Sequence, residues 1–429
     1  MRISAFLILL LVITFLVGIG IGYSIGYLTI PQQTTPVPKK NPLDGTVLLI
    51  GIIHSNPVYV QTEEAAALIA KEEIEKWLKD IGINMTIQLL FENAEGSATK
   101  ALEKLQSLAA RGVKFVLGFR WSSHVKACLD FANKNKILII SDASTSPALS
   151  IPNRGYLIRM PPDDTFQSKA IARMIFDYGV KYVAVLQRGD TWGDYLYDAF
   201  AKRYNELGGS VIYRVRYDPE KTEFSAEVKL LDDVIRDAIS KYGKDKVGLL
   251  LLAFEDDAVA IQAAASNYQN IMNVVWFGSD GHVRASRLVQ ELGPQALKVH
   301  HISTYVGIAM SDLYLRFADK FKSLTGLALP GAYDTYLYDS MWLLVRTIVE
   351  VGSTDVDKVY HAIFSVAERT YGASGWLALN EYGDRRGGVY DIWAVVEKGD
   401  YPEPGKIGWK LVGQYDPATD KVTWYERFS

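Results

Sequence analysis

Short polar side chains follow several apolar runs of this 429-residue chain, at the points where buried strands would end. The run ILII at 137–140 is followed by SDASTS, and the run FVLGF at 115–119 is followed by RWSS. Hydroxyl groups and the free amides at a helix N-terminus can hold an anionic group. These two chain segments therefore predict recognition of a small charged molecule.

A second set of polar and aromatic residues follows apolar runs later in the chain. Trp192 lies in DTWGD after KYVAVLQ, Phe254 ends VGLLLLAF, and Asp280 follows VVWFGS. A carboxylate can take an ammonium group, and aromatic rings can enclose an apolar part of a ligand. Together the two sets have the chemistry that a site for a small zwitterion needs. Ser122 taken alone is more simply interpreted as a helix cap.

The segments between these polar ends alternate between strand-like and helix-like patterns. Apolar runs of strand length occur at 46–53, 85–92, 114–119 and 137–141, and again at 181–187, 211–217, 247–254, 274–279 and 299–306. Segments with helical spacing of apolar residues lie between them, for example at 62–80, 97–111 and 164–178. The fold class is predicted to be α/β, with two doubly wound parallel-sheet lobes rather than one very wide sheet. In such sheets ligands bind beyond the carboxyl ends of the strands, which would bring the polar ends together.

The first 44 residues differ from the rest of the chain. Residues 5–28 form an uncharged apolar run, and about 20 such residues span a bilayer as a helix. The run is longer than the core of a secretory signal and lacks a clear A-x-A site. We therefore predict an uncleaved signal anchor, a transmembrane helix over residues 1–30, with a cleaved signal as the alternative. Residues 31–44 are rich in proline and threonine and predict a tether.

Several classes of function find little support in the composition. The net charge of −3 gives no general attraction to nucleic acid, and no nucleic-acid partner is expected. The single cysteine, Cys128, permits no intrachain disulfide and no cysteine-based metal cluster, and its apolar helix face predicts a core position. Asp256 and Asp257 begin a predicted helix, where acidic residues are favoured by the helix dipole. No catalytic residue, metal or cofactor is predicted.

The segments VKFVLGFRWSSH, ILIISDASTSPALS, RGYLIRM and VVWFGSDG carry a resemblance to a known family. In their order and spacing, the chain resembles the type I solute-binding proteins of ABC importers, in the branched-chain amino acid branch, over roughly residues 45–400. The resemblance implies the type I periplasmic-binding-protein fold, with two lobes joined by a multi-strand hinge. The implied boundaries are 45–162 plus about 305–387 for lobe 1, and 163–304 plus about 388–429 for lobe 2.

The resemblance also implies which residues hold a ligand. Ser122, Ala143 and Thr145 match family positions that hold the ligand carboxylate and amine. Asp280 matches an acidic residue that takes the ammonium group, and it is one methylene shorter than the expected glutamate. Phe254 stands where a tyrosine is expected, so that hydroxyl is missing.

Three further residues near this predicted site either match the family or differ from it. Trp192 matches the aromatic residue before a glycine near the cleft, whereas Arg120 and Asp142 are unusual for a site that accepts only leucine or valine. These departures leave the identity of the ligand open. The complete predicted ligand-binding set is Tyr59, Arg120, Ser122, Asp142, Ala143, Ser144, Thr145, Trp192, Phe254 and Asp280.

The resemblance implies an extracytoplasmic receptor of an ABC importer that closes two lobes around an amino acid or similar small polar ligand. Its partners would be a permease with its ATPase subunits, and the N-terminal helix would attach it to the cell membrane. The alternative is a ligand-sensing ectodomain of the same fold that signals through a separate partner. A hydrolase is a distant third. Serine, histidine and aspartate occur near one predicted cleft, but this is true of most polar clefts and does not indicate catalysis.

Overall fold

The computed structural model describes residues 10–17 and 41–425. The chain divides into two units, Met1–Pro42 and Leu43–Ser429. In the first unit, residues 10–17 form a helix whose side chains are exposed. Within the described residues, no helix combines the length and the apolar character needed to cross a membrane. The anchor predicted over residues 1–30 lies mostly outside the described residues and stays a prediction.

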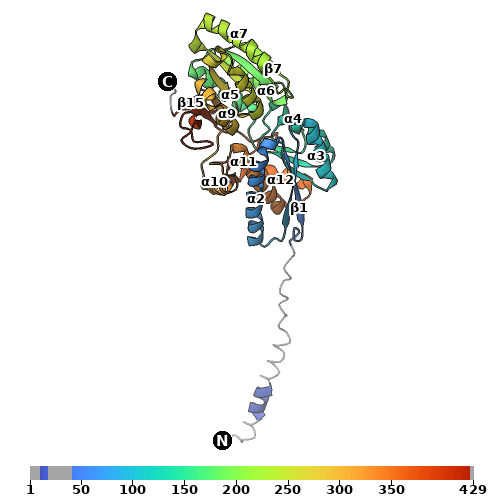
Figure 1. Cartoon of the computed structure of the whole chain (residues 1–429). Helices are drawn as coiled ribbons and strands as arrows, with labels where there is room; N and C mark the ends of the chain where they lie inside the picture. The colour runs from blue at the N-terminus through green and yellow to red at the C-terminus, as the bar shows by residue number, and fades with distance from the viewer. Residues whose placement is uncertain (1–9, 18–40, 426–429) are drawn as a thin grey trace. The chain divides into compact units, whose positions relative to one another are not determined.

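The second unit contains two large sheets with helices packed on them (Figure 1). The five-stranded sheet has the order β2-β1-β3-β4-β5, and all its neighbours are parallel. The eight-stranded sheet has the order β15-β14-β13-β10-β9-β8-β6-β7. Its neighbours from β10 to β7 are parallel, whereas β13, β14 and β15 pair in antiparallel fashion. The predicted fold class holds for the parallel strands, and the last three strands depart from it.

The strand bounds are as follows. In the five-stranded sheet they are β1 (Val47–His54), β2 (Thr86–Asn93), β3 (Phe115–Gly118), β4 (Leu138–Ser141) and β5 (Leu157–Arg159). In the eight-stranded sheet they are β6 (Tyr182–Arg188), β7 (Ser210–Tyr217), β8 (Val247–Leu252), β9 (Val275–Gly278), β10 (Ile302–Val306), β13 (Tyr390–Val396), β14 (Gly408–Asp416) and β15 (Lys421–Trp424). A small third sheet pairs β11 (Tyr371–Gly372) with β12 (Gly375–Trp376).

The helices fall into two groups by the sheet they accompany. With the first sheet are α2 (Val60–Asp80), α3 (Ala98–Ala110), α4 (Ser122–Lys134), α10 (Asp312–Thr325), α11 (Ala332–Val351) and α12 (Val356–Glu368). With the second are α5 (Asp164–Tyr178), α6 (Thr191–Glu206), α7 (Ser225–Tyr242), α8 (Glu255–Ala265) and α9 (Ser286–Lys298). Short 3-10 helices are η1 (Pro57–Tyr59), η2 (Pro147–Leu149), η3 (Lys244–Lys246) and η4 (Ile271–Asn273). We call each sheet with its helices the first half and the second half.

In the central strands β3 and β8, alternate side chains are buried on opposite faces of the sheet, as the two-residue period of a strand requires. In β3, Phe115 and Leu117 join the core beneath α2 and α11, while Val116 joins a separate core beneath α3 and α4. In β8, Leu250 packs with α5 and α6, and Leu251 packs with α7. Both faces are therefore apolar, which explains why these strands read as unbroken apolar runs.

The chain crosses between the halves three times. It passes from the first half to the second after β5, returns after β10, and passes again before β13.

Predicted and observed elements agree closely for α5, whereas β5 was not predicted because it has only three residues. Helix α9 extends to Lys298, because the chain resumes a helical path after a kink at Leu292, two residues before Pro294.

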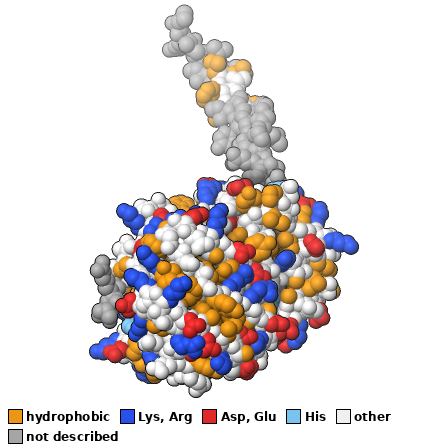
Figure 2. Space-filling view, turned by 90° about the horizontal axis from the view of Figure 1, so that it is seen from above, with side chains coloured by type: hydrophobic (Ala, Val, Ile, Leu, Met, Phe, Trp, Pro, Cys, Tyr) orange, Lys and Arg blue, Asp and Glu red, His pale blue; other side chains and the backbone are white. Residues whose placement is uncertain are grey.

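Positive and negative side chains are interspersed on the surface of the second unit. Figure 2 shows blue, red and hydrophobic side chains intermixed on the face seen there. This distribution agrees with the small net charge of the chain. A continuous basic stripe of the kind that tracks a nucleic acid backbone is not visible on that face.

Candidate ligand-binding site

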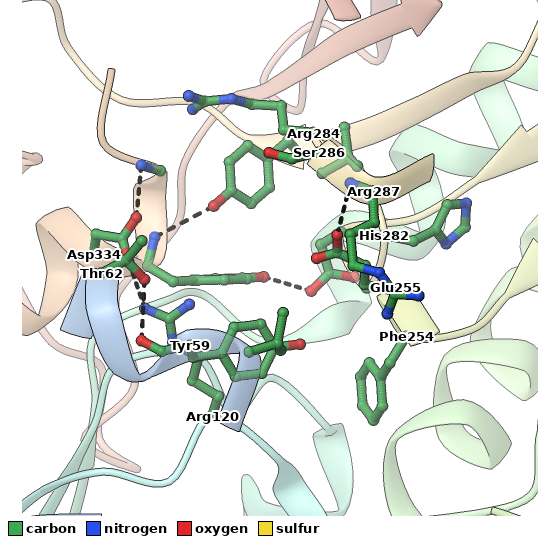
Figure 3. A pocket seen from close by; sticks show the side chains of 18 of the residues that line it. Tyr59, Thr62, Arg120, Phe254, Glu255, His282, Arg284, Ser286, Arg287 and Asp334 are labelled. Carbon is green, nitrogen blue, oxygen red and sulfur yellow. Dashed lines mark hydrogen bonds and ion pairs between the residues drawn. The ribbon is translucent and has the colours of Figure 1, made fainter. Parts of the chain in front are cut away.

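A cavity of about 390 Å³ lies between the two halves. In Figure 3, Tyr59, Thr62, Arg120 and Asp334 border it on one side, and Phe254, Glu255, His282 and Arg287 border it on the other. The first group comes from η1, α2, α11 and the segment after β3, and the second from the segments after β8 and β9 and from α8 and α9. The cavity therefore lies beyond the carboxyl ends of parallel strands, as expected for a doubly wound fold.

The cavity brings together most of the residues that the sequence pointed to. Those that line it are Tyr59, Arg120, Ser122, Ala143, Trp192, Phe254 and Asp280. Asp142, Ser144 and Thr145 are buried and are not among its lining residues. Ser144 and Thr145 thus lie behind the cavity lining in this structure, and Asp142 contacts the lining residue Arg120. Their part in ligand binding stays a prediction.

The hydroxyl-rich segment after β4 uses its side chains to connect parts of the protein. Thr145 Oγ1 donates to Asp164 Oδ2 at 2.9 Å, and Ser146 Oγ donates to the carbonyl oxygen of Thr191 at 2.8 Å. Both acceptors belong to the second half. The backbone N–H of Ser146 donates to Ser122 Oγ at 3.1 Å. These hydroxyls thus fix the loop beside the cavity and join it to the second half.

Ser122 does not cap α4. The N-cap position is Trp121, which makes no side-chain cap hydrogen bond, and Ser122 is the first residue of the helix. The capping interpretation was therefore wrong. Ser122 instead lines the cavity as the first residue of the helix, and its hydroxyl accepts the Ser146 N–H.

A buried ion pair supports the loop that follows β4. Arg159 donates to both oxygens of Asp384 at 2.7 Å, and both side chains are fully buried. Its Nη1 also donates to the carbonyl oxygens of Ser144 and Ser146, at 3.3 and 2.8 Å. A guanidinium can serve a carboxylate and nearby carbonyls together because its donors are fixed in one plane. The position of the loop therefore depends on Arg159.

Arg120 lies at the cavity within a cluster of carboxylates. Its Nε lies 2.5 Å from Glu63 Oε1 and 3.1 Å from Asp142 Oδ2, and its Nη2 lies 2.6 Å from Asp334 Oδ1. Burial opposes the charge of Arg120, but these three carboxylates raise its pKa well above the ordinary value. Burial raises the pKa of Asp142 to about 7, although Arg120 acts in the opposite direction. The guanidinium also lies 4.8 Å from the centre of the Tyr59 ring.

Asp280 is the main acidic group that the second half brings to the cavity. It accepts a hydrogen bond from the Tyr333 hydroxyl through Oδ2, while its buried Oδ1 lacks a partner of good geometry. Burial raises the pKa of Asp280, and hydrogen bonds from Tyr333 and Gln167 lower it. Burial and the nearby Asp280 raise the pKa of Asp164 well above the ordinary value. A ligand cation would relieve this repulsion between buried acids.

Gly281 lets the turn that carries Asp280 approach the end of β8. A Cβ atom at this position would lie 2.4 Å from the carbonyl oxygen of Ala253 and 2.9 Å from the ring of Trp192. Any larger residue would push the turn away from the cavity, so the DG pair after β9 serves the site.

Stacked aromatic rings form one wall. The ring centres of Trp121 and Phe254 are 4.6 Å apart, and those of Trp192 and Phe254 are 4.7 Å apart. The guanidinium of Arg188 lies 4.9 Å from the Phe254 ring and 5.1 Å from the Trp121 ring. Asp190 and Asp257 hold this guanidinium by ion pairs.

Sequence reasoning missed several lining residues, for two different reasons. Trp121 and Glu255 follow the strand ends that were already singled out, so their positions were a usable signal. Tyr333 and Asp334 lie in the first turn of α11, far from any predicted strand end. No local pattern marks them, because only the packing of α11 brings them to the cavity.

The site offers little for hydrolysis. Ser122 Oγ accepts the Ser146 N–H, and within the described part of the chain no histidine is hydrogen-bonded to it. Nucleophilic catalysis by serine needs such a base. Among the same described residues, no group of three or more histidine, cysteine, aspartate or glutamate side chains is arranged to hold a metal ion.

The chain is similar to proteins of two kinds. The uncharacterized protein MJ1266 of Methanocaldococcus jannaschii is 29% identical over 408 residues, covering 91% of this chain and 94% of that protein. Glutamate receptor 2.1 of Arabidopsis thaliana is 23% identical over 288 residues, covering 67% of this chain and 30% of the receptor. This chain thus spans under a third of the plant receptor.

Solved structures show the same fold. The leucine binding protein LivK of Thermotoga maritima has a TM-score of 0.73 and 20% identity, covering 87% of this chain and 99% of that one. The branched-chain amino acid transporter substrate binding protein LivJ of Streptococcus pneumoniae, solved with isoleucine, has a TM-score of 0.69 and 18% identity, with coverage of 86% and 99%. The resemblance seen in the sequence is confirmed. Residues 62–398 match the family described as receptor family ligand binding region, and the chain therefore belongs to that family.

Proposed function

We propose that this protein is an extracytoplasmic solute-binding receptor of an ABC importer. It closes its two halves around an amino acid-like ligand and passes it to a permease with its ATPase subunits. The observation that carries the proposal is the pairing of opposite chemistries across one cavity. Ser122 and the start of α4 come from the first half, and Asp280 comes from the second.

The first half supplies the anion-binding side. Ser122 begins a helix of 13 residues and lines the cavity beside Ala143. The first turn of a helix has unpaired N–H groups and a partial positive charge, and both favour a carboxylate. The second half supplies Asp280, which has a raised pKa and one oxygen without a good partner. An ammonium group would form a charge-assisted hydrogen bond there.

Closure follows from this division of the site. A ligand that contacts both halves stabilises the arrangement in which they approach, by the difference between its affinities for the closed and open states. The three crossing segments between the halves would form the hinge. Residues 1–30 would anchor the protein to the cell membrane, with the binding unit outside the cytoplasm.

A second candidate is a ligand-sensing ectodomain that signals through a separate partner. The similarity to a glutamate receptor favours it. Both functions need the same ligand site, so a binding experiment tests what they share. Reconstitution with a permease and its ATPase separates them, because only an importer receptor stimulates ATP hydrolysis and solute uptake.

The first test is thermal unfolding of the purified full chain with a panel of amino acids, dipeptides, aromatic acids and nucleosides. A ligand at 100 times its Kd stabilises the folded state by about 2.7 kcal/mol. We expect a shift with an amino acid that disappears in Asp280→Asn and persists in the control Asp198→Asn, whose side chain is 70% exposed. No shift with any amino acid would contradict the proposal.

A further inference from the structure

Glu255 is a carboxylate at the cavity without a charged partner. It is the first residue of α8 and lines the cavity beside Phe254. Its Oε1 accepts the backbone N–H of Arg287 at 3.2 Å. Among the described residues, no lysine or arginine side chain forms an ion pair with it. Burial raises the pKa of Glu255, although the N–H and the charge of Arg287 act in the opposite direction.

The nearest guanidinium is already engaged elsewhere. Arg287 Nη1 lies 2.5 Å from Asp256, and its Nε lies 2.9 Å from Glu291. The other two arginines that line the cavity are also occupied. Arg120 pairs with three carboxylates, and Arg284 donates to the carbonyl oxygens of Leu329 and Pro330.

Acidic groups therefore exceed basic groups around the cavity. The carboxylates at the cavity or paired with its arginines are Glu63, Asp142, Glu255, Asp256, Asp280, Glu291 and Asp334, against the guanidiniums of Arg120, Arg284 and Arg287. Asp280 alone suffices for one ammonium group. Glu255 then has no cationic partner, and the aliphatic side chain of a ligand would form no ion pair with it.

Aromatic rings surround the position of Glu255. Phe254 precedes it, and Tyr59 faces it from the first half (Figure 3). Burial raises the pKa of Tyr59, and the charge of Glu255 raises it further, so the two groups interact across the cavity. A carboxylate in these surroundings binds an organic cation by an ion pair with charge-assisted hydrogen bonds.

We propose that the ligand carries a second cationic group and that Glu255 binds it. Resting on the function proposed above, Asp280 takes the α-ammonium group and Glu255 takes the cation at the end of the ligand side chain. The ligand class is then a basic amino acid rather than an aliphatic one. Glu255 is accordingly the residue that determines specificity for the side chain.

The test compares ligands that differ in the second positive charge, using isothermal titration calorimetry on the full chain. Lysine is paired with norleucine, which lacks the terminal ammonium group, and arginine with the neutral citrulline. We expect one basic member to bind at least about tenfold more tightly than its neutral counterpart, a difference of about 1.4 kcal/mol. In Glu255→Gln this preference should fall below about threefold, because the ion pair is lost.

Asp198→Asn is the control. Its side chain is 70% exposed, and it does not line the cavity. It should keep the preference of the wild type for the basic ligand. Equal affinity of the wild type for charged and neutral members would overturn the inference but leave the proposed function standing. Binding of no amino acid at all would overturn both. A Glu255→Gln variant that keeps the full preference would also overturn the assignment of Glu255.

Discussion

The indole ring of Trp121 stacks on the phenyl ring of Phe254, with ring centres 4.6 Å apart and ring planes inclined by 12°. Trp121 belongs to the first half and Phe254 to the second, so the pair joins the two halves at the wall of the cavity. Aromatic pairs of this geometry add about 0.5–1.5 kcal/mol beyond the burial of their area.

Trp121→Ala is expected to lower the free energy of unfolding by about 3 kcal/mol, because a large buried ring and its stacking partner are lost. Trp376→Ala is the control, since that side chain is 60% exposed against 7% for Trp121. The control should cost less than about 1 kcal/mol. Chemical denaturation of the two variants and the wild type measures both effects. Equal losses would show that the stack contributes no stability.

Arg159→Met should destabilise the protein by about 1–3 kcal/mol, because the buried Asp384 would lose its two hydrogen bonds from Arg159 and keep Arg154 as its cationic partner. Arg386→Met removes an arginine from the exposed pair with Glu368 and should cost less than about 1 kcal/mol. Urea denaturation distinguishes the two. The loop after β4 should also move in the Arg159 variant, so ligand affinity should fall as well. A loss of stability without a loss of affinity would show that the carbonyl contacts do not position the loop.

Thr145→Val tests which residues of the first half contact the ligand. Its hydroxyl donates to Asp164, so the variant should lose about 1–3 kcal/mol of stability while ligand affinity changes by less than about threefold. Ser122→Ala, at the cavity, should weaken binding by about tenfold. Calorimetric titration with the ligand found by thermal unfolding decides between them. A strong loss of affinity in Thr145→Val alone would support the assignment of Thr145 made from the sequence.

A buried pair of histidines makes stability depend on pH. The Nε2 atoms of His282 and His301 lie 2.9 Å apart, and His282 Nδ1 lies 3.1 Å from the carbonyl oxygen of Ala253. A carbonyl can only accept, so we assign the proton of neutral His282 to Nδ1. Burial lowers the pKa of His282 from 6.5 to about 4.

As the pH falls, His282 is therefore protonated at a higher pH in the unfolded chain than in the folded protein. Stability from His282 is complete above about pH 7 and is lost between the unfolded pKa of 6.5 and the folded pKa of about 4. Between pH 7.5 and 5, we expect the stability of the wild type to fall by about 2 kcal/mol relative to that of His282→Gln. Denaturant unfolding at several pH values measures this difference. His361→Gln, at an exposed position, should follow the wild type at each pH. If the difference in stability between the wild type and His282→Gln did not vary with pH, the assignment of the pH dependence to His282 would be contradicted.

The local pattern of the sequence determined the parallel strands of both sheets, most of their helices and most of the residues where these strands end. Unbroken apolar runs and helical spacing arise from contacts within a few residues and within one face, so α5 and Phe254 could be placed from the sequence. The antiparallel direction of β13 depends on its pairing with β10, which lies more than 80 residues earlier in the chain.

The tertiary structure alone decided which side chains face the cavity. Thr145 turns to Asp164 and Ser122 turns to Ser146, because each hydroxyl finds its partner after the halves and loops have packed. Tyr333 and Asp334 reach the site on α11, which no strand-end rule could indicate. The direction of a side chain beyond a strand end depends on long-range hydrogen bonds and ion pairs, and these have no signature in a short stretch of sequence.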